Sequence, residues 1–95
     1  MNAPHPPPPD LATATPTLNK LFRLQHEAAQ QAWVLLYPEG MVRLNDSAAA
    51  ILQRCDGTRT VAVLIDELQQ AFGAEGIALE VQSFVAHAYE RGWLD

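Results

Sequence analysis

Cysteine and basic residues are scarce in this sequence. The one cysteine, Cys55, excludes an internal disulfide, a CxxC redox pair and a zinc site built from several thiolates. Six Lys and Arg residues stand against eleven Asp and Glu residues, and the net charge of -5 would repel a polyanion such as DNA. We therefore expect no nucleic acid among the partners, and a fold stabilised by packing alone.

Long apolar segments are missing as well. No run approaches the roughly 20 residues that span a bilayer, and prolines occupy the N-terminal region in which a signal peptide has its apolar segment. We expect no membrane contact and a cytoplasmic location. With 95 residues, 48% of them hydrophobic, the chain has the size of one domain rather than two.

The N-terminal residues differ in composition from the rest. Residues 1–17 contain six of the seven prolines and one large aliphatic residue, Leu11. Such a segment buries too little apolar surface to offset the entropy that is lost on ordering. We predict a disordered, Pro-rich tail over residues 1–17 and a single folded domain over residues 18–95.

Three short strands are predicted at the start of that domain. Phe22, Leu24 and His26 alternate with polar residues, which is the period of a half-buried strand. The segment WVLLY at 33–37 is too short for a helix and rich in residues that favour strands. The turn YPEG at 37–40 has Pro and Gly where a type I turn prefers them, and it predicts a hairpin into a third strand.

The third strand covers residues 41–44, and the register of its hairpin stays open from the sequence. A shift of one residue would move every side chain to the other face of the sheet. The two alternatives place either Trp33 and Leu35, or Val34 and Leu36, on the buried face with Val42 and Leu44.

Three helices are predicted after the strands, each with an apolar stripe at helical spacing. Asn45, Asp46 or Ser47 can cap the first and Thr60 the second, and the helices end at Gly57, Gly73 and Gly92. The fold class is therefore α+β and winged-helix-like, with a three-stranded antiparallel sheet followed by a three-helix bundle. The stripes consist of Ala48, Ile51, Leu52 and Cys55; of Val61, Leu64, Ile65, Leu68 and Phe72; and of Ile77, Val81, Phe84, Val85 and Ala88.

Catalytic constellations are hard to find in this sequence. It has no glycine-rich phosphate loop and no histidine spacing typical of a metal site. Cys55 could act as a thiolate with His26 or His87 as its base, but it lies on an apolar helical stripe, where a buried thiol is usually inert. We therefore predict that the protein is not an enzyme and has no catalytic residue, metal or cofactor. A thiol enzyme that uses Cys55 is an alternative hypothesis.

A winged-helix-like order of elements also suggests a DNA-binding protein, because such folds place one helix in the major groove. Contacts to phosphates and guanine need Lys or Arg. None occurs in residues 61–72, and the third helix has only Arg91 near its end. A winged-helix-type regulator that binds another protein or DNA is therefore the second hypothesis.

A small sheet has free edges, and an edge strand beside a helix can bind an extended peptide. The edge supplies backbone hydrogen bonds, and helix side chains supply pockets. On the third helix, Val85 at the margin of the stripe and Tyr89 beyond it either face such a groove or complete the core. The same edge permits strand exchange between two copies, which would give a homodimer.

Four sequence blocks occur in order: LLYPEG at 35–40, LN at 44–45, AxxILxxCDG at 48–57 followed by Thr60, and RGWL at 91–94. Together they resemble the coenzyme PQQ synthesis protein D (PqqD) family, over about residues 22–94. The resemblance implies that residues 18–95 form a peptide-recognition domain, of the kind that binds precursor peptides of ribosomally made, modified products.

The resemblance also implies partners. Proteins of this family capture the precursor peptide PqqA and deliver it to the radical SAM enzyme PqqE, which cross-links a glutamate and a tyrosine of that peptide. The iron–sulfur clusters and SAM belong to that enzyme. The role expected by resemblance is a peptide chaperone in pyrroloquinoline quinone (PQQ) biosynthesis that has no cofactor of its own.

In related recognition domains the peptide adds as an extra strand beside the third strand and packs against the third helix, which here correspond to residues 41–44 and 81–89. Arg43 either meets a peptide carboxylate, a contact worth about 0–1 kcal/mol, or stays solvated. The expected peptide-binding residues are Met41, Val42, Arg43 and Leu44 for the pairing, and Val81, Val85 and Tyr89 for side-chain contacts.

Overall fold

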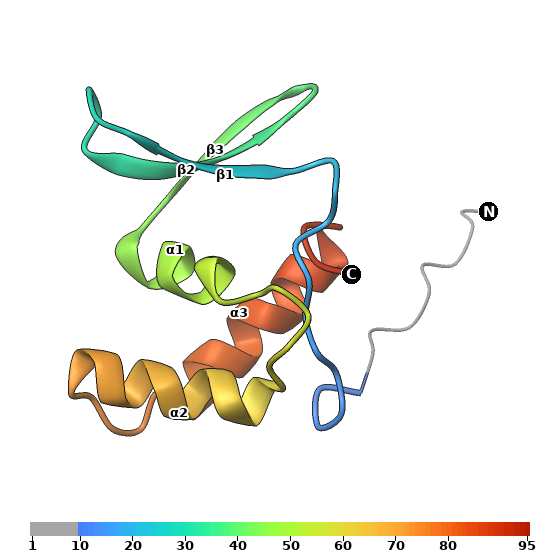
Figure 1. Cartoon of the computed structure of the whole chain (residues 1–95), viewed down its shortest axis with the longest axis vertical. Helices are drawn as coiled ribbons and strands as arrows, with labels where there is room; N and C mark the ends of the chain where they lie inside the picture. Colours follow the sequence, from blue (N-terminus) through green and yellow to red (C-terminus); the bar gives the residue numbers. More distant parts are fainter. Residues whose placement is uncertain (1–9) are drawn as a thin grey trace.

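The sheet and the helices occur in the predicted order. The computed structural model describes residues 10–95. Its elements are β1 (Arg23–Glu27), β2 (Ala32–Tyr37), β3 (Gly40–Leu44), α1 (Asp46–Gln53), α2 (Val61–Phe72) and α3 (Ala78–Glu90). The antiparallel sheet has the order β1-β2-β3, so β1 and β3 are its edges, and all three helices lie on one side of it (Figure 1). The predicted α+β fold is confirmed.

The pairing of β2 with β3 settles the hairpin register. Trp33 lies opposite Leu44, and Leu35 lies opposite Val42. Residues that face each other across an antiparallel pair share one side of the sheet. Leu35 and Leu44 belong to the main core, so this side packs on the helices and the first of the two alternatives is right.

The first strand lies where the alternation predicted it, with one exception to the expected burial. Phe22 and Leu24 are half-buried and pack against the main core. His26 is exposed, and its ring meets the ring of Trp33 edge-on with 5.3 Å between the centroids. The alternation therefore predicted the strand correctly but not the burial of its last apolar-side position.

α1 and α2 begin at side-chain caps that the sequence suggested, and α2 ends at the predicted glycine. Asn45 Oδ1 accepts a hydrogen bond from the Ala48 N–H at 2.8 Å, and Thr60 Oγ1 accepts one from the Val63 N–H at 3.3 Å. Such a cap typically stabilises a protein by about 1 kcal/mol. Gly73 ends α2 in the left-handed conformation, with φ at 60°, which glycine adopts without strain.

Two side chains depart from the predicted helical stripes. α1 ends at Gln53, so Cys55 follows the helix, although its side chain stays in the core at 4% exposure. Phe72 was expected in the buried stripe of α2 but is 58% exposed. Phe72 is the last residue of α2 and borders an open pocket. Its side chain points in the direction of the apolar stripe, but no neighbouring element within residues 10–95 covers it.

The helix stripes meet in one core under the sheet. Leu35 of β2, Leu64 of α2 and Val85 of α3 are fully buried in it, and no polar or charged residue is buried within residues 10–95. Packing of apolar side chains is thus the main source of stability in the described part of the chain. No helix there has both the length and the apolar character needed to cross a bilayer.

The structure differs from the predicted tail in residues 10–17. Pro16 is fully buried, and its carbonyl accepts a hydrogen bond from the Gly57 N–H at 3.0 Å. Thr17 and Asp95 exchange two backbone hydrogen bonds of 3.2 and 2.8 Å. The end of this segment is thus bonded to Gly57 and to Asp95, which are long-range contacts that local composition does not reveal. The rest of the predicted tail, residues 1–9, lies outside the described residues.

Candidate functional site

The free edge of β3 carries four of the predicted binding residues. Met41 is 51% exposed, Arg43 is exposed, Val42 is half-buried and Leu44 is buried. Val42 and Leu44 point to the helix side of the sheet, and Met41 and Arg43 point to the other side. An edge strand leaves N–H and C=O groups on its free side available to an added strand.

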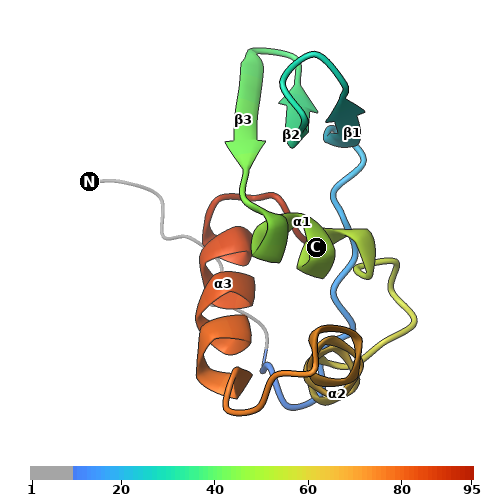
Figure 2. The ribbon, with the colours of Figure 1, turned by 90° about the vertical axis from the view of Figure 1, so that its left-hand side faces the viewer.

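β3 and α3 lie on the same side of the molecule, whereas β1 lies on the opposite side (Figure 2). The third strand and the third helix therefore share one side of the molecule, although the helix that packs against β3 is α1.

The three residues predicted on α3 differ in what they offer a ligand. Val85 is fully buried, so it completes the core, which is one of the two alternatives that the sequence left open. Val81 is 3% exposed and contributes only to the floor of a pocket. Tyr89 is half-buried against the core, and burial, followed by the charges of Cys55 and Asp95, raises the pKa of its hydroxyl.

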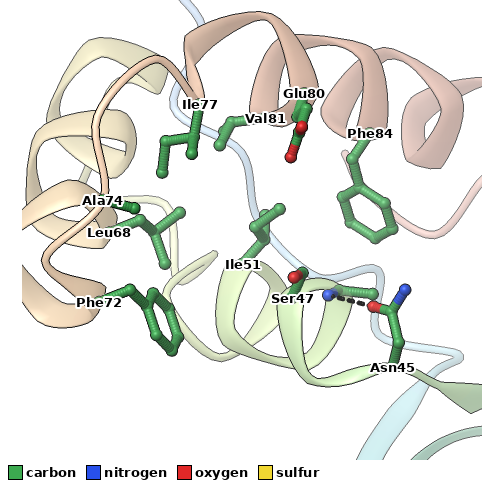
Figure 3. Close-up of a pocket in the computed structure, with 11 residues that line it drawn as sticks. Asn45, Ser47, Ile51, Leu68, Phe72, Ala74, Ile77, Glu80, Val81 and Phe84 are labelled. Atoms are coloured by element: carbon green, nitrogen blue, oxygen red, sulfur yellow. Dashed lines mark hydrogen bonds between the residues drawn. The ribbon is translucent and has the colours of Figure 1, made fainter.

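An apolar pocket of about 490 Å³ lies between the three helices, next to the end of β3. Figure 3 shows side chains from α1, α2 and α3 directed into a common space, with Phe72 and Phe84 on opposite sides of it. We call it the three-helix pocket. It is lined by Asn45, Ser47, Ala48, Ile51, Leu68, Phe72, Ala74, Ile77, Glu80, Val81 and Phe84.

Most residues of the three-helix pocket were missed as site residues by the sequence reasoning. Ile51, Phe72 and Phe84 were assigned to apolar stripes, which is correct for Ile51 but incomplete for the two aromatic residues. A helical stripe predicts which side chains point inward, but not where three helices fail to close over them. The available signal was a large aromatic residue, Phe72, at the last position before the glycine stop.

The charges around the pocket are acidic. Residues 60–90 contain no Lys or Arg, and Glu80 lines the pocket itself. The two arginines that precede this segment, Arg54 and Arg59, pair with Glu67 at 3.8 and 2.8 Å. A ligand that places an apolar side chain in the pocket and a basic group beside it would match this surface.

Cys55 has the environment of a core thiol rather than of a nucleophile. Burial, together with the neighbouring charge of Asp56, raises its pKa to about 12, so the reactive thiolate is rare at neutral pH. Its thiol donates to the Ile51 carbonyl oxygen at 3.2 Å. The prediction that Cys55 is a core residue is confirmed. Among residues 10–95, no group of three or more His, Cys, Asp and Glu side chains is arranged to hold a metal ion.

Three antiparallel strands, three helices and a free edge strand beside an apolar pocket define a small winged-helix-like binding fold. The family model of coenzyme PQQ synthesis protein D (PqqD) matches residues 32–94. The chain belongs to the PqqD family.

Relatives and solved structures agree with this assignment. A PqqA binding protein of Stutzerimonas stutzeri (strain A1501) is 48% identical over 84 residues, which cover 87% of this chain and 91% of the relative. A PqqA binding protein of Methylococcus capsulatus is 44% identical over 77 residues, which cover 81% and 83% of the two chains.

The fold resembles two solved PqqD structures. The solution NMR structure of the PqqD truncation of Methylobacterium extorquens PqqCD, a functional, stand-alone RiPP recognition element, has a TM-score of 0.71 and 28% identity, with 88% of this chain and 92% of that chain covered. The crystal structure of PqqD from Xanthomonas campestris has a TM-score of 0.56 and 34% identity, with 87% and 94% covered.

Proposed function

We propose that this chain binds the precursor peptide PqqA in PQQ biosynthesis and performs no chemistry itself. The observation that carries the proposal is the free β3 edge next to the three-helix pocket, since strand and pocket together match the two needs of an extended peptide. Relatives that are 44% and 48% identical are PqqA binding proteins, which supports the same ligand for this chain.

The peptide would bind as a fourth strand beside β3. Backbone groups of Met41, Val42, Arg43 and Leu44 would form the new ladder, as antiparallel or parallel strands do. At the Leu44 end of β3, the peptide chain would reach Asn45 and the three-helix pocket, where one large apolar side chain fits among Ile51, Phe72 and Phe84. Val81 and Val85 would act from beneath, by holding the pocket floor and α3 in place.

The bound peptide would then be delivered to PqqE for the Glu–Tyr cross-link. A carrier of this kind raises the local concentration of the peptide and fixes its position, without contact to the reacting atoms. The proposal places both events in the cytoplasm, where the ribosome makes the peptide. The β3 edge would also pair with the β3 edge of a second copy, so a homodimer of this kind would compete with the peptide.

The experiment is an NMR titration of the isotope-labelled chain with synthetic PqqA at moderate salt. We expect saturable amide shifts at residues 41–44 and methyl shifts at Ile51 and Ile77. A peptide of the same composition in scrambled order is the control. If PqqA causes no saturable shifts, direct capture by this chain is wrong.

A second readout separates strand addition from other modes of binding. Methylation of single backbone nitrogens of PqqA removes one donor each, and successive N–H groups of a strand point to opposite sides. We expect affinity to fall at every second position of the paired segment and to change little at the positions between. Equal losses at all positions would contradict an added strand.

A further inference from the structure

A short segment before β1 is hydrogen-bonded on both of its sides, although it lies outside the three-stranded sheet. Its successive N–H groups donate alternately to the C-terminal residues and to the loop after α1 (Figure 1). The bonds run from Thr17 to the carbonyl of Asp95 at 3.2 Å, from Leu18 to that of Cys55 at 3.0 Å and from Asn19 to that of Trp93 at 2.8 Å. Such alternation is typical of a strand between two neighbours. We call residues 16–19 the linking segment.

The linking segment is connected to two walls of the three-helix pocket, through one residue each. On the α1 side it bonds to Cys55, whose thiol donates to the carbonyl of the pocket residue Ile51 at 3.2 Å. On the α3 side it bonds to Trp93, whose ring centroid lies 6.3 Å from that of the pocket residue Phe84. A displacement of the segment would therefore be felt by pocket side chains on both helices.

The backbones of α1 and α3 make few direct contacts. Among the helices, α3 packs mainly against α2, whereas α1 packs against α2 and the strands. The linking segment is bonded just beyond the end of each of these two helices, and it fits closely there. Pro16 is fully buried, and a Cβ atom added at Gly57 would lie 2.6 Å from Thr17 Oγ1. The separation of α1 and α3 thus depends on a segment that belongs to neither helix.

We propose that the linking segment holds α3 against the end of α1 and thereby sets the shape of the three-helix pocket that takes the peptide side chain. This inference rests on the proposed function. The residues of the segment are positioning residues, because they act through Ile51 and Phe84 and do not touch the peptide. They precede residues 32–94, the part of the chain that the family model matches, and none of them was among the predicted binding residues.

The test compares Leu18→Ala with the matched control Leu24→Ala. Both leucines are half-buried and pack against the main core, but Leu24 lies on β1, at the opposite edge of the sheet from β3. Urea unfolding should show similar losses of stability for the two variants. We expect Leu18→Ala to bind synthetic PqqA about fivefold or more weakly, and Leu24→Ala to stay within about twofold of the wild type, as measured by fluorescence anisotropy.

A double variant shows whether the linking segment acts through the pocket. In a chain that already carries Phe84→Ala, the change Leu18→Ala should have little further effect on PqqA affinity, because variants that act through the same contact are not additive. Asn19→Ala replaces Leu18→Ala if the latter does not fold. It removes a hydrogen bond of 3.1 Å to Asp95 Oδ1 and should weaken binding about threefold, with the same dependence on Phe84.

The outcomes separate this inference from the proposed function. If Leu18→Ala is folded and binds PqqA as tightly as the wild type, the positioning role is wrong and peptide capture stands. The role is also wrong if Leu24→Ala loses as much affinity, since the loss then follows stability alone, or if the loss is unchanged in the Phe84→Ala chain. If the wild type does not bind PqqA, the proposed function is wrong, and this inference is wrong with it.

Discussion

Large apolar side chains are buried in the core under the sheet but exposed on the side of the molecule that carries β3 and the three-helix pocket, which we call the binding side. In the core, Leu64 and Val85 are fully buried, with no buried polar residue around them. On the binding side, Met41 and Phe72 are 51% and 58% exposed. A single helix contributes to both regions, because α3 places Val85 in the core and Phe84 at the pocket.

This difference teaches that stability and recognition are carried by separate side chains. A core side chain stabilises the fold by leaving water, whereas an exposed apolar side chain contributes only when a ligand covers it. Substitutions in the two regions should therefore affect different measurements.

Leu64→Ala should produce the largest loss of stability. It removes most of a fully buried side chain from the core, which typically costs about 2–5 kcal/mol. Urea unfolding followed by circular dichroism measures it. Phe72→Ala, at the exposed pocket, should lose less than about 1 kcal/mol. Similar losses for the two variants would remove the distinction between the two regions.

Alkaline pH should weaken the core through Cys55. Its folded pKa of about 12 lies above that of an unfolded thiol, about 8.5–9, so the unfolded state loses this proton first as the pH rises. This contribution to stability is present below about pH 9 and should fall by about 1.4 kcal/mol per pH unit until about pH 12.

The measurement is the pH slope of the unfolding free energy in the wild type and in Cys55→Ala. Other groups that titrate in this range act on both chains, so the difference between the two slopes belongs to Cys55 and to the effect of its charge on Tyr89. Equal slopes would contradict a buried, protonated thiol. Iodoacetamide at pH 8 gives a second readout, since it should label the thiol in urea and leave it unlabelled in the native chain.

The binding side should respond in peptide affinity rather than in stability. Phe72→Ala should weaken PqqA binding about tenfold, because it removes one side of the three-helix pocket. Leu79→Ala is the matched control, since Leu79 is 75% exposed on the adjacent helix and does not line the pocket. Fluorescence anisotropy of labelled PqqA measures both. Equal affinities for the two variants would show that the pocket takes no peptide side chain.

The smallest expected effect concerns the charge at the pocket. Glu80→Gln should weaken PqqA binding by about 0–1 kcal/mol if a basic peptide residue lies beside the pocket, and the loss should shrink in 0.5 M salt. Glu90→Gln makes the same change at the far end of α3 and should have no effect. A loss that is equal in both variants would indicate net charge rather than a local contact.

Much of the fold was predictable because its signals are local. The cap at Thr60, the stop at Gly73 and the turn at 37–40 each depend on a few neighbouring residues, and the structure has all three. The contacts of Pro16 and Thr17 were not predictable, because their hydrogen bonds are to Gly57 and Asp95, which are distant in sequence. Composition reports how much apolar surface a segment has, but not the hydrogen bonds that it finds elsewhere.

Of the two parts of the candidate site, the β3 edge was predictable from the sequence and the three-helix pocket was not. The free edge over residues 41–44 follows from the strand count, since the last strand before the helices has one neighbour. The three-helix pocket did not follow, because a helical stripe marks the inward direction of Phe84 without giving the distance to the facing helix. Val85 illustrates the same limit, since only packing decided that it lies in the core.

The order of the strands and helices, the cap at Thr60, the stop at Gly73 and the acidic character of the helical side follow from local features of the sequence, whereas the first helix ends at Gln53 and not at the expected Gly57. These properties depend on period, capping and charge, which act within a few residues. The hairpin register, the attachment of Pro16 and Thr17 and the opening between α1, α2 and α3 depend instead on tertiary packing. These three features arise where distant segments meet, and there the fit of side chains to one another selects one arrangement among several that the local pattern allows.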